Sequence, residues 1–321
     1  MDKKFHTNLV VSSAPHIVTD QDTTRLMGTV LLALVPALAA SVYIFGLRVL
    51  LLSLVSVIAC VGFEYIWNAA LKKTQTVGDL SAALTGLLLA MNVPSSFPIW
   101  QLILGDCFAI IVVKALYGGL GKNFVNPAIT ARIFLFISFA SNMSTWPVTK
   151  LAGTDAVTGA TPLAIIGEGA FDKAALPTLQ QMLLGLRGGA CGEVCALALI
   201  IGGIFLIIKK IISPIIPCAF IGTVFVIALI ATGSVYQAVF HCLAGGVMLG
   251  AFFMATDYVT SPKLPFGQLI FGIGCGLITM GIRFLGSYPE GVSFSILFMN
   301  ICTPLINRWS YKVYLKKGGK K

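Results

Sequence analysis

The sequence of 321 residues is poor in charge, since Asp, Glu, Lys and Arg together make up 11% of it. In soluble globular domains, these four residue types make up about 25% of the chain. Apolar residues instead account for 57% of the chain, and the mean hydropathy is +0.92. The 21 Phe and 4 Trp residues exclude a disordered or fibrous chain, because such side chains must be buried. The class that remains is an all-α polytopic membrane protein.

Signals for other classes of protein are also missing. The eight cysteines contain no Cys-x-x-Cys pair, which is the usual spacing of zinc and thioredoxin sites. Cys191 and Cys195 would share a helical face, but an iron–sulfur cluster needs about four thiolates. Residues 1–25 have no apolar core as long as that of a signal peptide. We therefore expect this segment to stay in the cytoplasm.

Apolar runs long enough to cross a hydrocarbon core, together with two shorter ones, give ten candidate spans. The shorter ones are 79–92 and 127–140. The other eight are 26–45, 49–70, 100–117, 193–208, 214–232, 236–255, 267–285 and 292–307. An even number of spans places both termini on the same side of the membrane.

The distribution of Lys and Arg supports this topology. Fifteen of the 22 fall in segments that would be cytoplasmic, and three lie in or beside spans. The four on the outer side are Arg48, Lys150, Lys173 and Arg187. Cytoplasmic segments of membrane proteins carry such an excess of positive charge. Topology thus explains the net charge of +10, and we expect the lipid bilayer, not nucleic acid, as a partner.

An internal similarity divides the chain into two halves. Gln101–Gly105 and Gln268–Gly272 have nearly the same sequence, and each follows a proline by three residues. Chance similarity between apolar segments is the alternative. Each half has five spans. Because five is odd, the second half starts on the opposite side of the membrane and must be inverted relative to the first, as in many transporters. The predicted organisation is a cytoplasmic segment 1–25, repeats 26–140 and 193–307, an outer loop 141–192 and a basic cytoplasmic tail 308–321.

The outer loop contains the sequence from Asp155 to Thr161, Asp-Ala-Val-Thr-Gly-Ala-Thr, followed by Pro162. Its composition is that of a turn, because Gly159 permits positive φ and Pro162 fixes its own φ. The motif is also similar to the one that a dedicated FMN transferase recognises, in which the last threonine carries FMN through a phosphoester bond. That similarity implies Thr161 as the acceptor, within a motif formed by Asp155, Thr158, Gly159 and Ala160.

The resemblance extends along nearly the whole chain. The segments Ser12–His16, Gly119–Pro127, Phe253–Pro262 and Tyr288–Asn300 resemble the D subunits of Rnf complexes, which are related to the B subunit of the sodium-pumping NADH:quinone reductase. Thr158 stands where serine is frequent in that family, and Tyr258 stands where proline is expected.

The family resemblance implies a function and its cofactors. The chain would be a membrane redox subunit of a complex that couples ferredoxin oxidation and NAD reduction to Na⁺ or H⁺ transport in the bacterial cytoplasmic (inner) membrane. It would carry covalent FMN on the outer side, and some members also hold noncovalent riboflavin, for which the sequence shows no motif. Other subunits and the FMN transferase are the implied partners. No strand followed by Gly-x-Gly-x-x-Gly is present, so NAD chemistry belongs to those subunits.

Ionisable residues in or near spans are candidates for function, because charge in hydrocarbon is costly. They are Glu64, Asp79, Asp106, Lys114, Arg132, Asp257 and Arg283. We expect Asp79, Lys114 and Arg132 to cap helices or to reach the membrane surface. Asp257 with Thr256 and Thr260 could contact a hard cation such as sodium, although capping of the following loop is the alternative.

Two other functions compete with the redox subunit. A channel or secondary transporter for a small solute would also be built on an inverted repeat, and a structural scaffold is the third possibility. The motif from Asp155 to Thr161 separates the first two, since a solute channel has no use for it.

Overall fold

The computed structural model describes residues 22–147, 163, 177–185, 188–286 and 290–318. These residues form helices and no β-strand, and each predicted span overlaps a helical segment. The first half contains α1 (Thr23–Phe45), α2 (Leu47–Ala70), the 3₁₀ turn η1 (Val77–Asp79), α3 (Ser81–Met91), α4 (Ile99–Cys107), the π-helical η2 (Phe108–Ala115) and α5 (Pro127–Ser138). The second contains α9 (Ala196–Ile208), α10 (Ile215–Thr232), α11 (Val235–Leu243), α12 (Val247–Leu249), the π-helical η4 (Gly250–Met254), α13 (Pro265–Leu285) and α14 (Val292–Gly318).

Four helices, α1, α2, α10 and α13, are long and apolar enough to cross a membrane. A fifth candidate is the pair formed by α11 and the segment Val247–Met254, which bend by 65° at their junction. Helices α3, α5 and α9 have only 11, 12 and 13 residues. At about 1.5 Å per residue they cover roughly 20 Å or less, which is short of a hydrocarbon core about 30 Å thick. Ten complete spans and their inverted repeat therefore remain predictions.

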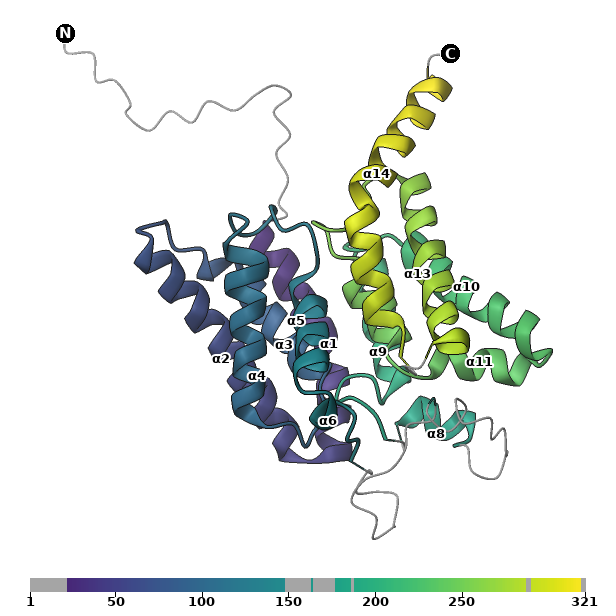
Figure 1. The fold of residues 1–321 in the computed structure, drawn as a ribbon, viewed down its shortest axis with the longest axis horizontal. Helices are drawn as coiled ribbons and strands as arrows, with labels where there is room; N and C mark the ends of the chain where they lie inside the picture. The colour runs from purple at the N-terminus through teal and green to yellow at the C-terminus, as the bar shows by residue number, and fades with distance from the viewer. Residues whose placement is uncertain (1–21, 148–162, 164–176, 186–187, 287–289, 319–321) are drawn as a thin grey trace.

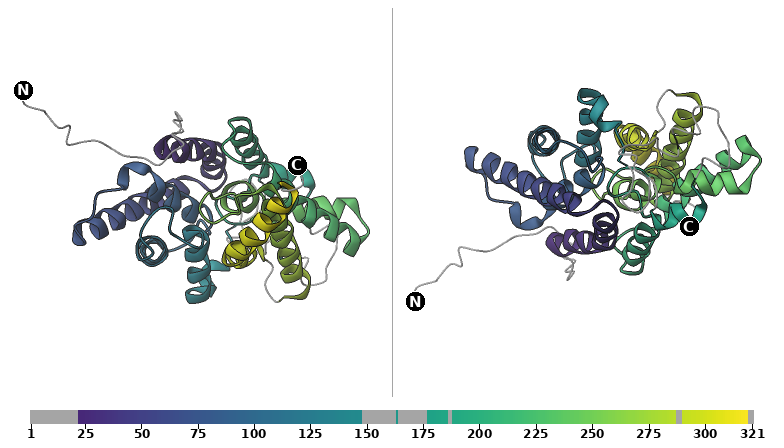
Figure 2. Two further views of the ribbon diagram at one scale, coloured as in Figure 1. Left: turned by 90° about the horizontal axis from the view of Figure 1, so that it is seen from above. Right: turned by 90° about the horizontal axis from the view of Figure 1, so that it is seen from below.

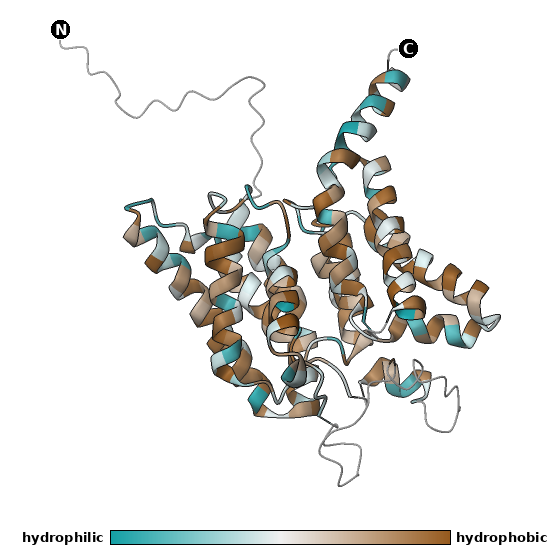
Figure 3. Cartoon of the chain, viewed as in Figure 1, coloured by the Kyte–Doolittle hydropathy of each residue, from teal (hydrophilic) through white to brown (hydrophobic). Residues whose placement is uncertain are grey.

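The helices form two groups that lie side by side (Figures 1 and 2). Helices α1 to α5 make up one group and α9 to α14 the other, with α1 packed against α9 and α5 against α14. The start of α1 and the end of α14 lie at the same end of the molecule (Figure 1). Two short helices flanking the loop, α6 (Ala140–Met143) and α8 (Leu179–Leu184), lie at the opposite end. Figure 3 shows apolar residues along most of the long helices and polar residues toward the free end of α14.

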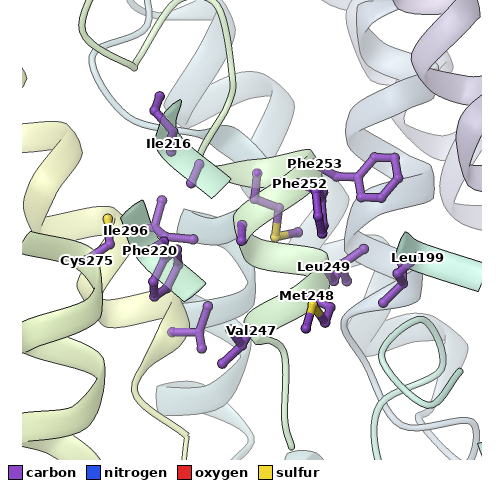
Figure 4. Close-up of a cluster of buried hydrophobic side chains, with 14 of the residues drawn as sticks. Leu199, Ile216, Phe220, Val247, Met248, Leu249, Phe252, Phe253, Cys275 and Ile296 are labelled. Atoms are coloured by element: carbon purple, nitrogen blue, oxygen red, sulfur yellow. The ribbon is translucent and has the colours of Figure 1, made fainter. Parts of the chain in front are cut away.

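The halves meet at a buried apolar cluster centred on α12 and η4 (Figure 4). Phe252 and Phe253 of η4 pack in the same cluster as Leu199 of α9. A Cβ on Gly202 would lie 2.3 Å from the carbonyl oxygen of Ala33, and one on Gly203 would lie 2.4 Å from Phe252. Glycine is therefore required where α9 approaches α1 and η4. Such small residues at helix contacts are typical of membrane bundles, because lipid provides no hydrophobic drive for association.

Two segments outside the predicted spans are also helical. The outer loop contains α8, which begins with a capping box between Thr178 and Gln181. Reciprocal hydrogen bonds of this kind stabilise the first turn of a helix. At the other end of the chain, α14 continues without a break from residue 292 to 318, so most of the basic tail extends the last helix.

Candidate functional site

The predicted flavin attachment site, from Asp155 to Thr161, lies outside the described residues, but Leu163 is described and buried, with 5% exposure. It belongs to the main apolar cluster. A Cβ on Gly245 would lie 2.8 Å from Leu163 Cδ1 and 3.1 Å from Arg283 Nη2. Leu163 thus packs beside the break between α11 and α12, two residues after Thr161.

The break between α11 and α12 is held by an arginine. Arg283, in the last turn of α13, donates hydrogen bonds to the carbonyl oxygens of His241 at 2.7 Å and Ala244 at 2.9 Å. These carbonyls belong to the end of α11, where a helix leaves acceptors without internal partners. Gly245 follows with a φ of 63°, a conformation that glycine adopts at little cost.

A buried ion pair joins the two halves near this break. Arg132 of α5 donates to Glu290, which precedes α14, and to the hydroxyl of Ser293. Burial raises the pKa of Glu290, but the charge and hydrogen bond of Arg132 outweigh burial and hold that pKa below its ordinary value. Glu193, which accepts a hydrogen bond from Ala190 N–H at 3.0 Å, also interacts with Glu290. The expectation that Arg132 reaches the membrane surface is wrong, because it is buried with 6% exposure.

A second buried ion pair lies within the first half. Lys114 Nζ is 2.9 Å from Glu64 Oε1 and 2.6 Å from the hydroxyl oxygen of Ser81. Lys114 is 3% exposed, so the expectation that it reaches the surface is also wrong. Asp79, in contrast, accepts a hydrogen bond from Ser81 N–H at 2.8 Å at the start of α3, which confirms its predicted capping role.

Of the residues predicted to contact a cation, Asp257 and Thr260 lie together, whereas the Thr256 hydroxyl bonds elsewhere. Thr260 donates to Asp257 Oδ2 at 2.9 Å, and the N–H groups of Tyr258, Val259 and Thr260 also bond to this carboxylate. Thr256 instead donates to the carbonyl oxygen of Phe252 at 2.7 Å. Asp257 and Thr256 line a pocket between the halves, opposite Lys114 and Asn126. Among the described residues no group of three or more His, Cys, Asp or Glu side chains is suited to a metal.

The cysteine pair near the outer loop has the character of packed residues. Cys191 is buried, and its N–H donates to the carbonyl oxygen of Val93 at 3.0 Å. Burial raises the pKa of the Cys191 thiol to about 12, so the thiol is neutral at physiological pH.

Comparison with known proteins decides the family. The family model described as "NQR2, RnfD, RnfE family" matches residues 10–316 of the chain. The chain belongs to this family. Three relatives show how close the similarity is within it. The D subunit of the Na⁺-translocating ferredoxin:NAD⁺ oxidoreductase complex of Acetobacterium woodii is 48% identical over 305 residues, which is 94% of each chain.

The D subunit of the proton-translocating ferredoxin:NAD⁺ oxidoreductase complex of Clostridium ljungdahlii is 42% identical over 94% of this chain and 95% of that protein. The D subunit of the ion-translocating oxidoreductase complex of Halorhodospira halophila is 36% identical over 92% of each. Relatives in the NQR2, RnfD, RnfE family thus include proteins named for Na⁺ and proteins named for H⁺, so the names do not decide which ion this chain handles.

Membership of the family confirms the resemblance stated from the sequence, whereas the buried ion pairs were missed. Lys114 and Glu64 are 50 positions apart, and Arg132 and Glu290 are 158 apart. Each pair joins segments far apart in the sequence, which no periodicity within one segment can reveal. The only signal was the presence of charge inside apolar runs.

Proposed function

We propose that this chain is the D subunit of an ion-translocating ferredoxin:NAD oxidoreductase complex in the bacterial cytoplasmic membrane. The observation that supports this most strongly is the similarity to subunits of that name along at least 92% of the chain. Other membrane and peripheral subunits of the complex are the expected partners. They would bind NAD and ferredoxin, because this sequence has no strand followed by the Gly-x-Gly-x-x-Gly pattern of a dinucleotide-binding fold.

Covalent FMN on Thr161 is part of the proposal. The position of Leu163 supports it, because two residues of extended chain span about 7 Å at most, so Thr161 lies within that reach of Leu163. Arg283 and Leu163 both lie beside Gly245, and a guanidinium group is a suitable neighbour for the negative phosphodiester. When bound, the flavin would accept and pass on electrons one at a time. The chain's own contribution is the burial of Leu163, two residues after Thr161, beside Gly245. Noncovalent riboflavin belongs to the same proposal, without an assigned set of residues.

The flavin itself provides the test. The native complex is denatured, its subunits are separated on a gel, and flavin fluorescence is recorded under ultraviolet light. We expect fluorescence in the band of this 34.0 kDa chain. A channel or secondary transporter is the competing function, and the pocket lined by both halves favours it. A band without fluorescence, from a host that has the FMN transferase, would support the transporter instead.

The outer location of the motif is a separate proposal with its own test. Ser144 and Thr178 flank the motif, and both are exposed. In a chain without native cysteines, Ser144→Cys or Thr178→Cys should react with an impermeant maleimide added to intact cells. Lys316→Cys, near the free end of α14, should react only after lysis. The reverse pattern would place the flavin on the cytoplasmic face and contradict the predicted topology.

We also propose that Asp257, with Thr256 and Thr260, contacts the transported cation. Asp257→Asn keeps an oxygen that can accept the loop's hydrogen bonds but removes the charge. We expect less ion uptake per electron in vesicles, with ferredoxin-dependent NAD reduction retained. An unchanged ratio of ions to electrons would leave Asp257 as a loop cap. Equal loss of both activities, with reduced expression, would indicate a folding role.

A further inference from the structure

A continuous row of polar side chains follows the buried face of α2. Ser53, Ser56, Cys60, Glu64 and Asn68 recur every three or four residues, and each is buried. Residues with this spacing lie above one another on one side of a helix. Helices in a membrane protein bury such groups where they have a use or a partner.

One end of this row opens into a pocket. Asn68 donates to the hydroxyl oxygen of Thr76 at 3.0 Å, and Thr76 donates to Glu64 Oε1 at 2.8 Å. Glu64, Asn68, Thr76 and Lys114 all line this pocket. The hydrogen bonds therefore connect the pocket to the Glu64–Lys114 ion pair.

Toward its other end the row meets Asp106. Cys60 Sγ donates to Asp106 Oδ1 at 3.3 Å, and Ser56 Oγ is 2.6 Å from the same oxygen. Beyond Asp106 the row continues only to Ser53, whose hydroxyl donates to a carbonyl oxygen of its own helix. Leu52 and Leu102, one turn farther along α2 and α4, are fully buried in one apolar cluster and close the row.

The hydrogen bonds of Ser56 assign a proton to Asp106. Ser56 Oγ is 2.8 Å from the carbonyl oxygen of Gly86 as well as 2.6 Å from Asp106 Oδ1. A hydroxyl has one hydrogen to donate, so one of these two contacts needs a hydrogen from elsewhere. A proton on Asp106, donated to Ser56 while Ser56 donates to Gly86, completes both contacts. The close approach of α3 to α2 at this point requires glycine, since a Cβ on Gly86 would lie 2.7 Å from the carbonyl oxygen of Ser56.

The surroundings of Asp106 also favour its neutral form. Its exposure is 0%, and its Oδ2 atom has no hydrogen-bond partner. Within the described part of the chain Asp106 forms no ion pair, since Lys114 is paired with Glu64. A buried carboxyl group without a counter-charge becomes protonated rather than remain ionised.

We propose that Asp106 is a proton-binding carboxyl group at the closed end of a polar half-path, which runs along α2 from the pocket beside Asn68. A proton that leaves Asp106 is taken up by the Glu64 carboxylate by way of Cys60, so that Asp106 becomes a carboxylate and Glu64 a neutral carboxyl group; the reverse step returns the proton to Asp106. The π-helical η2 begins two residues after Asp106 and contains Lys114, and such segments recur at functional sites. In the predicted repeat Ile273 takes the place of Asp106, so the fold of a repeat does not require the acid.

Infrared spectroscopy of the purified complex tests this assignment. The role of this proton in transport rests on the proposed translocase function. The protonation state of Asp106 does not, because infrared spectroscopy detects it without turnover of the complex. At neutral pH and without sodium, we expect a protonated-carboxyl band that shifts in D₂O and is lost in Asp106→Asn. Asp79→Asn removes a capping carboxylate and serves as the control that keeps the band. If Asp106→Asn does not fold, a shift of the band in Ser56→Ala provides the same assignment.

The path is tested by the rate at which this band shifts after transfer to D₂O. We expect Glu64→Gln, or the milder Thr76→Val, to slow the exchange about tenfold. Thr279→Val, which alters a buried hydroxyl pair with Ser295 in the second half, should leave the rate unchanged. Absence of the band, equal exchange in all variants, or loss of the band on adding sodium would each overturn the proposal.

Discussion

Thr161→Ala is expected to abolish covalent flavin on this chain while the protein still inserts into the membrane. The reason is chemical, because alanine has no hydroxyl through which a phosphoester can form. Insertion should not depend on this hydroxyl, because Thr161 belongs to the predicted outer loop 141–192 and not to any of the apolar runs. The measurement is flavin fluorescence of the denatured subunit, normalised to the amount of protein in the band.

Thr158→Ala is the matched control, since Thr158 is the other hydroxyl of the motif. We expect it to keep a fluorescent band, although recognition by the transferase can be weaker. Mass analysis of the peptide containing both threonines then identifies the modified one. Fluorescence retained in Thr161→Ala and lost in Thr158→Ala would move the attachment site to Thr158.

Arg132→Leu is expected to destabilise the protein by about 3–5 kcal/mol, because it leaves the Glu290 carboxylate buried without its partner. The side chains of Arg132 and Glu290 are only 8% and 15% exposed. The double variant Arg132→Leu/Glu290→Leu should recover much of the loss, since it removes the uncompensated charge as well. Unfolding of the detergent-solubilised complex, followed by thermal denaturation, measures both effects.

The pH dependence of the stability difference between wild type and Arg132→Leu distinguishes an ion pair from simple packing. The pKa of Glu290 is held below its ordinary value of 4.5 in the folded protein. The pair's contribution to stability is therefore complete above that value and declines as pH falls through the lower folded pKa. The difference between wild type and Arg132→Leu should shrink in acid. A difference that is independent of pH would assign the effect to lost packing.

The sequence could predict the helices but not how they meet. Hydropathy located the helical segments of the ten predicted spans, because an apolar run such as 215–232 carries its own signal. Hydropathy could not decide whether the short helices α3 and α5 reach both membrane surfaces, since that depends on how they pack against their neighbours. Charges showed the same limit. Asp79 was correctly assigned as a cap because its partner, Ser81, is two residues away.

The partners of buried charges required the fold. Arg132 was expected to cap a helix or to reach the membrane surface, because a sequence places it near a helix end but cannot show that Glu290 lies beside it. The same reasoning left Asp106 without a role. Its neighbours Ser56 and Gly86 come from two other helices. The flavin motif, by contrast, was found only because a short contiguous sequence is what a modifying enzyme reads.

The enclosure of α3 has a consequence for how the chain is synthesised. Every residue from Ser81 to Met91 except Leu84 is buried, and α3 packs against α1, α2, α4 and α5. When α3 leaves the ribosome, α4 and α5 have not yet been made. A nascent chain that ends before α5 therefore lacks one of the four helices that enclose α3. The first half can close around α3 only after residue 138 has emerged, which makes α5 the step that completes its assembly.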